Sequence, residues 1–163
     1  MNLIFVDYDK CVGCELCAIR CSLEKTGTCN PARSRIRVLK QEEEGITMPA
    51  VCRHCDEPYC IPACPENAIS KNVETGLVKI DADICIGCKL CVEACPYSGP
   101  VNIPVTGKKV HNIKVICDFC NGHPACVEVC PTGALQFVTI DEAMAERQKQ
   151  GLEKLAKLLT SLG

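Results

Sequence analysis

The spacing of the cysteines is the feature that most constrains this chain. Of its 163 residues 17 are cysteine, and all of them except Cys29 fall into four groups of four. Cysteine at about one residue in ten is the level that indicates either a disulfide scaffold or a metal protein. The four motifs, named first to fourth in chain order, are CVGCELCAIRC (11–21), CRHCDEPYCIPAC (52–64), CIGCKLCVEAC (85–95) and CDFCNGHPACVEVC (117–130).

The spacing within the motifs favours iron–sulfur clusters over single metal ions. The first and third motifs read C-x2-C-x2-C-x3-C, the run of bacterial ferredoxins, whose fourth cysteine ligates the other of two clusters. If a helix begins at Cys17, Cys21 lies on the same side, about 6 Å further along the axis. Zinc sites use two close pairs separated by a longer arm. The second and fourth motifs insert extra residues before their third cysteine, so a zinc-binding interaction module remains the less favoured alternative.

The odd number of cysteines and the lack of a secretion signal argue against disulfides. The N-terminal stretch MNLIFVDYDK has no basic region, and Asp7 and Asp9 interrupt its apolar run. No stretch reaches the 18 consecutive apolar residues typical of a membrane span. We therefore predict a cytoplasmic, reducing location without direct membrane insertion, in which thiols bind metals. Export together with a signal-bearing partner is the alternative.

The flanks of the motifs repeat as well. VDYDKCVGCELC (6–17) aligns in character with IDADICIGCKLC (80–91), and the last cysteines of the second and fourth motifs begin the related stretches CPENAI and CPTGAL. Short β-branched stretches at Leu77–Ile80 and Val110–Ile116 predict strands. The repeating unit is therefore a strand, a cysteine loop, a short helix, a turn and a second strand.

Residues 22–51 interrupt this repeat and predict a loop and a hairpin, with Ile36 and Val38 on one face and residues 46–51 returning. The hairpin carries a group of basic side chains followed by an acidic run at 42–44. This pattern predicts a solvated surface, with a partner-docking surface as the alternative and phosphate binding disfavoured. The basic residues are Arg33, Arg35, Arg37 and Lys40.

Residues 139–163 predict a C-terminal helix. Thr139 and Glu142 have the spacing of a capping box at its start. An apolar stripe follows at helical intervals. We expect this stripe to pack on the body of the protein, and docking to a partner subunit is the alternative. The stripe consists of Leu152, Leu155, Leu159 and Leu162.

The composition leaves the core short of large side chains. The chain has no Trp, three Phe and three Tyr, although aromatic residues usually bury the largest areas. Sixteen cysteines could hold four 4Fe-4S clusters, which can serve as core because metal binding is coupled to folding. Four such clusters at −2 each would bring the formal charge from −2 to about −10, favouring a basic patch on a partner and giving no indication of nucleic acid binding.

The order and spacing of the four motifs resemble the four-cluster polyferredoxin family over about residues 1–138. The widened second and fourth motifs and the stretch CPYSGP after the third carry this resemblance. The family comprises iron–sulfur electron-transfer subunits of molybdenum and tungsten oxidoreductases, carbon monoxide dehydrogenases and hydrogenases. This chain departs from the pattern at Ser22, where a proline would follow the fourth cysteine.

The resemblance implies that the first and fourth motifs share two clusters and that the second and third share the other two. Each cluster then takes three cysteines from one motif and one from the other. We name these ligand sets sites A to D. Site A is Cys11, Cys14, Cys17 and Cys130; site B is Cys117, Cys120, Cys126 and Cys21; site C is Cys52, Cys55, Cys60 and Cys95; site D is Cys85, Cys88, Cys91 and Cys64.

The implied fold is α+β, with two ferredoxin-like 4Fe-4S dicluster modules, the second inserted in the first, and a C-terminal helix. The outer module would comprise residues 1–51 and 105–138, with the hairpin insertion at about 30–50. The inner module would comprise residues 52–104, and the helix residues 139–163.

The implied function is electron transfer by a non-catalytic subunit, since sixteen cysteines leave no open iron site. The stretch CNPARSRIRV favours a tungsten-type aldehyde oxidoreductase as partner, with carbon monoxide dehydrogenase or hydrogenase as alternatives. Two terminal clusters could also allow copies to associate end to end. Cys29 has no partner group at ligand spacing and is not expected to be a ligand. We expect His54, His111 and His123 to be surface or hydrogen-bonding residues.

Overall fold

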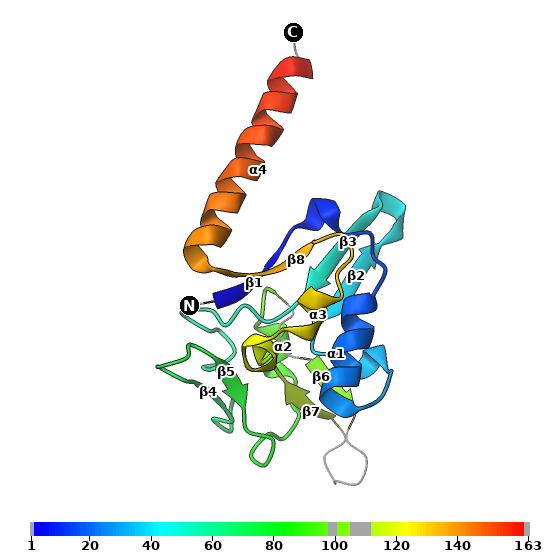
Figure 1. Cartoon of the computed structure of the whole chain (residues 1–163). Coiled ribbons are helices and arrows are strands. Elements are labelled where there is room, and N and C mark those ends of the chain that lie inside the picture. The colour runs from blue at the N-terminus through cyan, green and yellow to red at the C-terminus, as the bar shows by residue number, and fades with distance from the viewer. Residues whose placement is uncertain (1, 98–100, 105–111, 162–163) are drawn as a thin grey trace.

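The computed structural model describes residues 2–97, 101–104 and 112–161. Within these residues the chain forms four separate two-stranded antiparallel sheets, short helices and one long C-terminal helix (Figure 1). The expected mixture of helices and strands is therefore confirmed. No helix of the described residues is both long and apolar enough to span a bilayer.

The helices and strands follow the order of the cysteine motifs. The strands are β1 (Asn2–Val6), β2 (Arg37–Gln41), β3 (Ile46–Ala50), β4 (Ile69–Lys71), β5 (Val78–Ile80), β6 (Val101–Pro104), β7 (Asn112–Val115) and β8 (Leu135–Thr139). The α-helices are α1 (Leu16–Thr26), α2 (Leu90–Glu93), α3 (Ala125–Glu128) and α4 (Ile140–Ser161). Short 3-10 turns are η1 (Tyr8–Lys10), η2 (Pro31–Arg33), η3 (Glu42–Glu44) and η4 (Phe119–Gly122).

The first and last strands of the cysteine-rich body pair with each other. β1 and β8 are antiparallel, from Asn2 opposite Thr139 to Val6 opposite Leu135. β4 and β5 form a second ladder between the second and third motifs, with Ile69 opposite Ile80. Both strand stretches expected from the sequence form: β5 begins one residue inside its expected range, and β7 covers residues 112–115. Val110 and His111 lie outside the described residues.

Residues 37–50 form the expected hairpin, in which β2 pairs with β3 along their whole length. Ile36 precedes the hairpin and is 1% exposed. The expectation of a solvated basic face is wrong in part, because Arg33, Arg35 and Arg37 are half-buried. Ion pairs account for two of the basic side chains: Arg35 contacts Asp118 and Lys40 contacts Glu15.

Cysteine occupies much of both apolar cores. The larger core combines apolar residues of β1, β8 and the hairpin region with Cys17, Cys21, Cys117 and Cys126. The smaller core places Cys60 and Cys91 beside apolar residues of β4 and β5. α1 and α3, which carry cysteines of the first and fourth motifs, pack against each other. Part of each cysteine motif therefore lies in the interior of the protein.

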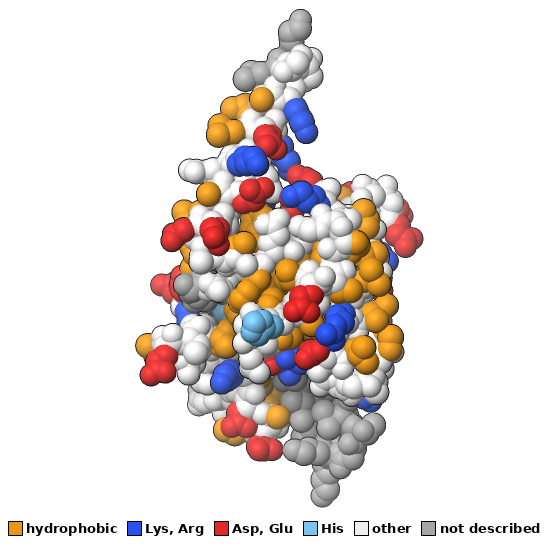
Figure 2. All heavy atoms as spheres, in the orientation of Figure 1, with side chains coloured by type: hydrophobic (Ala, Val, Ile, Leu, Met, Phe, Trp, Pro, Cys, Tyr) orange, Lys and Arg blue, Asp and Glu red, His pale blue; other side chains and the backbone are white. Residues whose placement is uncertain are grey.

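Helix α4 begins at the predicted place and then leaves the body (Figure 1). The capping box is confirmed: the Thr139 N–H donates to Glu142 Oε2 at 2.8 Å, and the Glu142 N–H donates to Thr139 Oγ1 at 3.3 Å. The expected packing of the leucine stripe on the body is wrong for Leu152 and Leu155, which are 68% and 53% exposed. Figure 2 shows apolar side chains lying open along this helix. The Leu159 side chain and Leu162 lie outside the part of the chain that the structure describes.

Candidate metal centres

The two halves of the sequence repeat have the same backbone anchoring. Asp7 and Asp81 follow β1 and β5, and their N–H groups donate to the carbonyls of Ala134 and Ala68, each at 2.8 Å. Each aspartate side chain then accepts the N–H two residues further on. The strand before the first motif is therefore joined to the stretch after the fourth, as the strand before the third motif is joined to the stretch after the second.

The first and third motifs also have the same loop conformation. Gly13 and Gly87 have φ angles of 68° and 73°, and Glu15 and Lys89 have φ angles of 62° and 71°. A Cβ atom at Gly13 would lie 2.9 Å from the Thr47 side chain, so this turn requires glycine for space as well as for its φ angle. Left-handed residues in such loops turn backbone N–H groups to one side, and these nests bind anions.

Two cavities bring together the cysteines of the second and third motifs. In each cavity, three cysteines come from one motif and the fourth from the other. One cavity is lined by Cys52, Cys55, Cys60 and Cys95 together with residues that include Tyr59, Val78 and Ile116. The other is lined by Cys64, Cys85, Cys88 and Cys91 together with residues that include Ala68, Ile69 and Ile80. The structure therefore groups the residues of sites C and D.

The cysteines of site A are close enough to one another to interact electrostatically. The pKa of the Cys17 thiol is raised to about 11: burial is the largest cause, the Ala18 N–H opposes it, and the charges of Cys14, Cys11 and Cys130 contribute to the rise. Cys14 is exposed at the surface, whereas Cys17 is buried.

Site B is more deeply enclosed. Burial raises the pKa of Cys126 strongly, and Cys117, Cys21, Cys17 and Cys120 add to the effect in that order. Burial likewise raises the pKa of Cys117 to about 12, where Cys21 is the largest of the contributing cysteine charges. Cys126 therefore lies close to the other cysteines of site B and also to Cys17 of site A.

Several backbone N–H groups donate to the cysteine sulfur atoms. Arg35 N donates to Cys21 Sγ at 3.4 Å, His54 N to Cys52 Sγ at 3.5 Å, and Ala68 N to Cys64 Sγ at 3.3 Å. At Cys130, burial raises the pKa, but the N–H groups of Leu135, Ala134 and Thr132 and the Thr132 hydroxyl outweigh it and lower the pKa. These donors favour the thiolate form that a metal requires.

A charged network lies beside site B. Asp118 Oδ1 is 2.8 Å from Lys25 Nζ, and Asp118 Oδ2 is 2.7 Å from Arg35 Nη1. The Cys120 N–H also donates to Asp118 Oδ1 at 3.1 Å. Burial raises the pKa of the Asp118 carboxyl, but Lys25 and Arg35 outweigh it and hold the pKa below its ordinary value.

The described histidines and the remaining cysteine lie as follows. His54 is 1% exposed, and its Nδ1 accepts the Val78 N–H at 2.9 Å. Burial lowers the pKa of His54 to about 4, so its ring is neutral at pH 7. It is thus a hydrogen-bonding residue in the interior, whereas His123 is exposed. Cys29 is exposed, and His111 lies outside the described residues.

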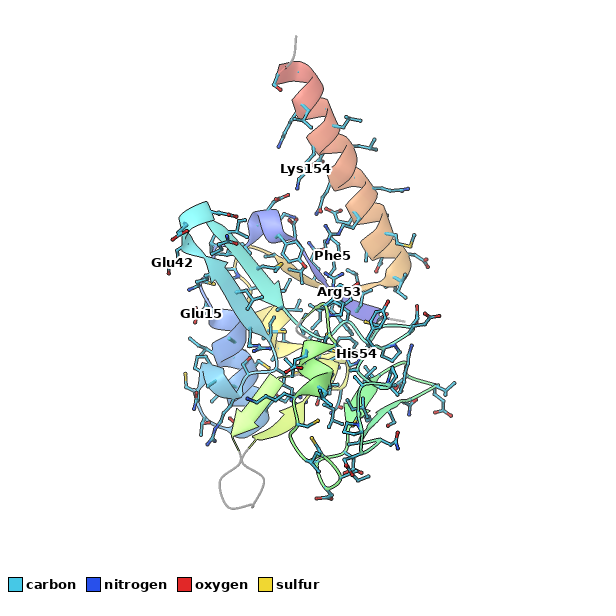
Figure 3. The ribbon with its side chains drawn as sticks, turned by 180° about the vertical axis from the view of Figure 1, so that it is seen from behind. Phe5, Glu15, Glu42, Arg53, His54 and Lys154 are labelled. Atoms are coloured by element: carbon cyan, nitrogen blue, oxygen red, sulfur yellow. The ribbon has the colours of Figure 1, made fainter. Side chains whose placement is uncertain are left out.

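A further cavity lies between β1 and the start of α4. Its volume is about 440 Å³, and its lining includes Phe5, Arg53, Met144 and Arg147 but no cysteine. Figure 3 shows Phe5 and Arg53 between the body and the base of this helix. Arg53 also stacks on the Tyr97 ring at 4.6 Å. This cavity therefore offers no thiol ligand for a metal.

The cysteine quartets do not have the geometry of zinc sites. Among the described residues, no three His, Cys, Asp or Glu side chains are arranged to hold a single metal ion. A zinc site brings its sulfur atoms to about 2.3 Å from one ion. A cubane separates its thiolates because each binds a different iron. The donor set of four cysteines around each cavity therefore fits a 4Fe-4S cluster.

Two charged residues beside site B, Lys25 and Asp118, are not predicted by the cysteine motifs. Lys25 is four residues after Cys21, a spacing that places both side chains on one helical face. Asp118 directly follows Cys117. The sequence signal for this contact is Ser22, which stands where the other motifs have proline. Without that proline the helix can continue as far as Lys25.

Comparison with known proteins agrees with this chemistry. The 4Fe-4S dicluster domain family matches residues 43–140. The polyferredoxin-like subunit of an aliphatic sulfonate oxidoreductase from Pyrococcus furiosus is 44% identical over 97 residues, covering 60% of this chain and 56% of the relative. A tetrathionate reductase subunit from Archaeoglobus fulgidus is 41% identical over 102 residues, covering 63% of this chain and 49% of the relative.

Among solved structures, a chain of the active site complex BamBC of benzoyl coenzyme A reductase has a TM-score of 0.48 at 25% identity, covering 96% of this chain and 89% of that chain. This chain spans about half the length of the curated relatives that it matches. The family match covers more than half of this chain and includes the second, third and fourth motifs. The chain belongs to the 4Fe-4S dicluster domain family.

Proposed function

We propose that this chain is a non-catalytic electron-transfer subunit that carries electrons through four 4Fe-4S clusters at sites A to D. The observation that carries this proposal is the grouping of cysteines from two motifs around each of two cavities. A cluster bound in this way ties together loops that lie far apart in the sequence. When bound, such a cluster takes up and releases electrons at a potential set by charge, hydrogen bonds and solvent exposure.

The internal sequence repeat supports the ligand sets proposed for sites A and B, because it relates these sites to sites C and D. The Asp7 anchor joins the first and fourth motifs in the way that the Asp81 anchor joins the third and second. Burial is the largest cause of the raised pKa of Cys17, and the charges that add to it are those of the other three cysteines of site A. The zinc-module alternative has no supporting geometry within the described residues.

The same repeat supports an inserted arrangement of two modules. We propose that residues 1–51 and 105–138 form the outer module, residues 52–104 the inner one, and residues 139–163 a separate helix. In this arrangement the ladder of β1 and β8 closes the outer module and that of β4 and β5 closes the inner one.

We further propose the order A, B, C, D along the path of the electrons. Cys17 of site A is close to Cys126 of site B, and Cys117 of site B contributes to the raised pKa of Cys52 in site C after burial, the largest cause. Cys60 of site C and Cys91 of site D share one apolar core. In this order each site lies next to the site to which it would pass an electron.

The two ends of this path lie nearest to solvent. Cys14 of site A and Cys88 of site D are exposed, whereas site B contains no exposed cysteine. Aliphatic side chains lie open beside both ends: Val12 is 67% exposed and Ile86 is 54% exposed. The chain's own part is to ligate through thiolates, to direct N–H groups at sulfur and to exclude water from the central sites.

The partners are proposed as oxidoreductase subunits. The two relatives named above are subunits of oxidoreductases by their names. For this chain we propose a tungsten-type aldehyde oxidoreductase, with carbon monoxide dehydrogenase, hydrogenase or a molybdenum enzyme as the alternatives. The exposed face of α4 is available for such contacts. End-to-end association of copies through the exposed aliphatic groups of sites A and D, and a cytoplasmic location, belong to the same proposal.

Two measurements on anaerobically purified protein test the proposal. Four clusters predict about sixteen irons and sixteen sulfides per chain, each cluster being 4Fe-4S. Eight irons would leave only two clusters, and a zinc-containing protein without iron would overturn the function. Native purification followed by metal analysis then identifies the partner: a co-eluting subunit that contains tungsten supports the first choice, and one with nickel or molybdenum supports an alternative.

A further inference from the structure

The length of α1 distinguishes the first motif from the third and fourth. Each of α1, α2 and α3 begins one residue before the third cysteine of its motif. α2 and α3 contain four residues each, whereas α1 contains 11 and ends at Thr26. The difference lies in the residue after the fourth cysteine. Proline there disfavours helical conformation of the cysteine itself, and Ser22 does not.

Ser22 stabilises the extra turn. It is 0% exposed, and its hydroxyl donates to the Ile19 carbonyl at 2.8 Å while accepting the Asn30 N–H at 3.1 Å. The Thr26 hydroxyl donates to the Ser22 carbonyl at 2.7 Å. Gly27, with a φ of 65°, ends the helix through its N–H bond to the Leu23 carbonyl. The helix therefore includes Lys25, one turn beyond Cys21.

Lys25 reaches back to the loop of the fourth motif. Its side chain is 14% exposed, and its Nζ lies 2.8 and 3.0 Å from the two carboxylate oxygens of Asp118. Burial lowers the pKa of Lys25, but Asp118 and then Cys120 outweigh it and raise the pKa. The ammonium thus lies beside a cysteine of site B as well as beside Asp118.

Arg35 adds a second cation beside site B. Its backbone N–H donates to Cys21 Sγ, and its guanidinium pairs with Asp118. Two cations and one carboxylate leave a net charge of +1 next to site B. At site A, by contrast, Lys40 pairs with Glu15, and both side chains are more than one third exposed.

We propose that Lys25 sets the reduction potential of the cluster at site B and raises it above the value that the thiolates alone would give. This inference rests on the proposed function. One added electron makes the centre more negative by one charge, and a partly buried cation nearby favours the reduced form. The long α1, made possible by Ser22, is the structural device that supplies this charge.

The experiment is an anaerobic redox titration of the holoprotein followed by electron paramagnetic resonance. Lys25→Gln removes the charge and retains hydrogen-bonding capacity, Lys25→Arg retains the charge, and Lys157→Gln removes an equal charge from the distant α4. We expect Lys25→Gln to lower the reduction equilibrium constant of one cluster about tenfold, or about 59 mV for one electron. The other clusters, and all clusters in Lys25→Arg and Lys157→Gln, should change less than about twofold.

Asp118→Asn provides a second, opposite change. It removes the negative charge between Lys25 and Arg35 while keeping an oxygen for the Cys120 N–H. The same cluster should then become easier to reduce. If Lys25→Gln loses iron, the direction in which Asp118→Asn shifts the reduction potential of that cluster becomes the test. A higher potential supports the proposal, and an unchanged or lower one overturns it. Unchanged potentials, or equal shifts of all clusters, would overturn the role of Lys25, whereas a wild-type iron count far from sixteen would overturn the proposed function instead.

Discussion

The crossed assignment of cysteines at sites A and B can be tested by counting iron in double variants. Cys17 and Cys21 belong to the same motif and the same helix, yet we assign them to different clusters. Cys126 belongs to the fourth motif and is assigned to the cluster of Cys21. The comparison is therefore between Cys21→Ala/Cys126→Ala and Cys21→Ala/Cys17→Ala, each of which removes two buried cysteines.

The expected losses differ twofold. If loss of one ligand empties a site, the variant at Cys21 and Cys126 loses one cluster, or about four irons of about sixteen. The variant at Cys21 and Cys17 loses two clusters, or about eight irons. Within-motif ligation predicts the reverse order. When two residues bind the same cluster, the iron loss of the double variant is smaller than the sum of the losses in the two single variants. A double-mutant cycle detects such coupling in the same way.

The assay is iron and sulfide analysis after anaerobic reconstitution, with single variants measured alongside. Cys29→Ala is the matched control, because Cys29 is exposed and lies outside the four motifs. It should retain the full iron content. Equal iron loss in the two double variants, or greater loss at Cys21 and Cys126, would refute the crossed ligand sets.

Three further changes test packing, capping and the exposed helix. Because Ile36 is 1% exposed, Ile36→Ala should lower the free energy of unfolding by about 2–5 kcal/mol and Ile36→Val by about 0.5–1.5 kcal/mol. Anaerobic denaturant titration measures both values, and equal losses in the two variants would contradict this packing. Thr139→Ala removes the capping box and should destabilise the start of α4 by about 1 kcal/mol, which amide hydrogen exchange would detect as faster exchange in its first turns than in wild type. The double change Leu152→Gln/Leu155→Gln should alter the free energy of unfolding by less than about 0.5 kcal/mol, as is usual at the surface. The same change should reduce the amount of partner subunit recovered in native purification. A large loss of stability would show that these two side chains are packed.

The local elements are predictable from the sequence because their signals are local. The capping box at Thr139 and Glu142 depends on residues three apart, and its hydrogen bonds form as expected. The hairpin of β2 and β3 also forms where alternating apolar residues indicate it. The matching positions of Asp7 and Asp81 follow from the sequence repeat, since equal local sequences adopt equal turns.

Contacts between distant segments are harder to predict. The leucine stripe of α4 has the spacing of a buried face, but spacing cannot tell whether the helix stays on the body. The position of Arg35 between Cys21 and Asp118 depends on the path of residues 27–36, for which the residue pattern predicts only a loop. The charge pattern of the hairpin therefore predicts a solvated surface, although Arg35 reaches into the charged network at site B.

The distribution of regular structure explains why the clusters should decide whether this chain folds. In the described residues each sheet has only two strands, and an isolated two-stranded sheet is marginally stable in water. Four of the ten buried residues of the larger core are cysteines, and so are two of the five in the smaller one.

Burial raises the pKa of Cys52 and Cys117 to about 12, so without metal these thiols stay protonated and bind one another weakly. Iron bound at the proposed sites would convert them to thiolates and join both halves of the repeat, so that metal binding would supply folding free energy. Removal of iron by an anaerobic chelator should therefore abolish the cooperative unfolding transition and leave a largely disordered chain by circular dichroism. An iron-free chain that retains native-like dichroism and a cooperative melt would show instead that the apolar residues suffice.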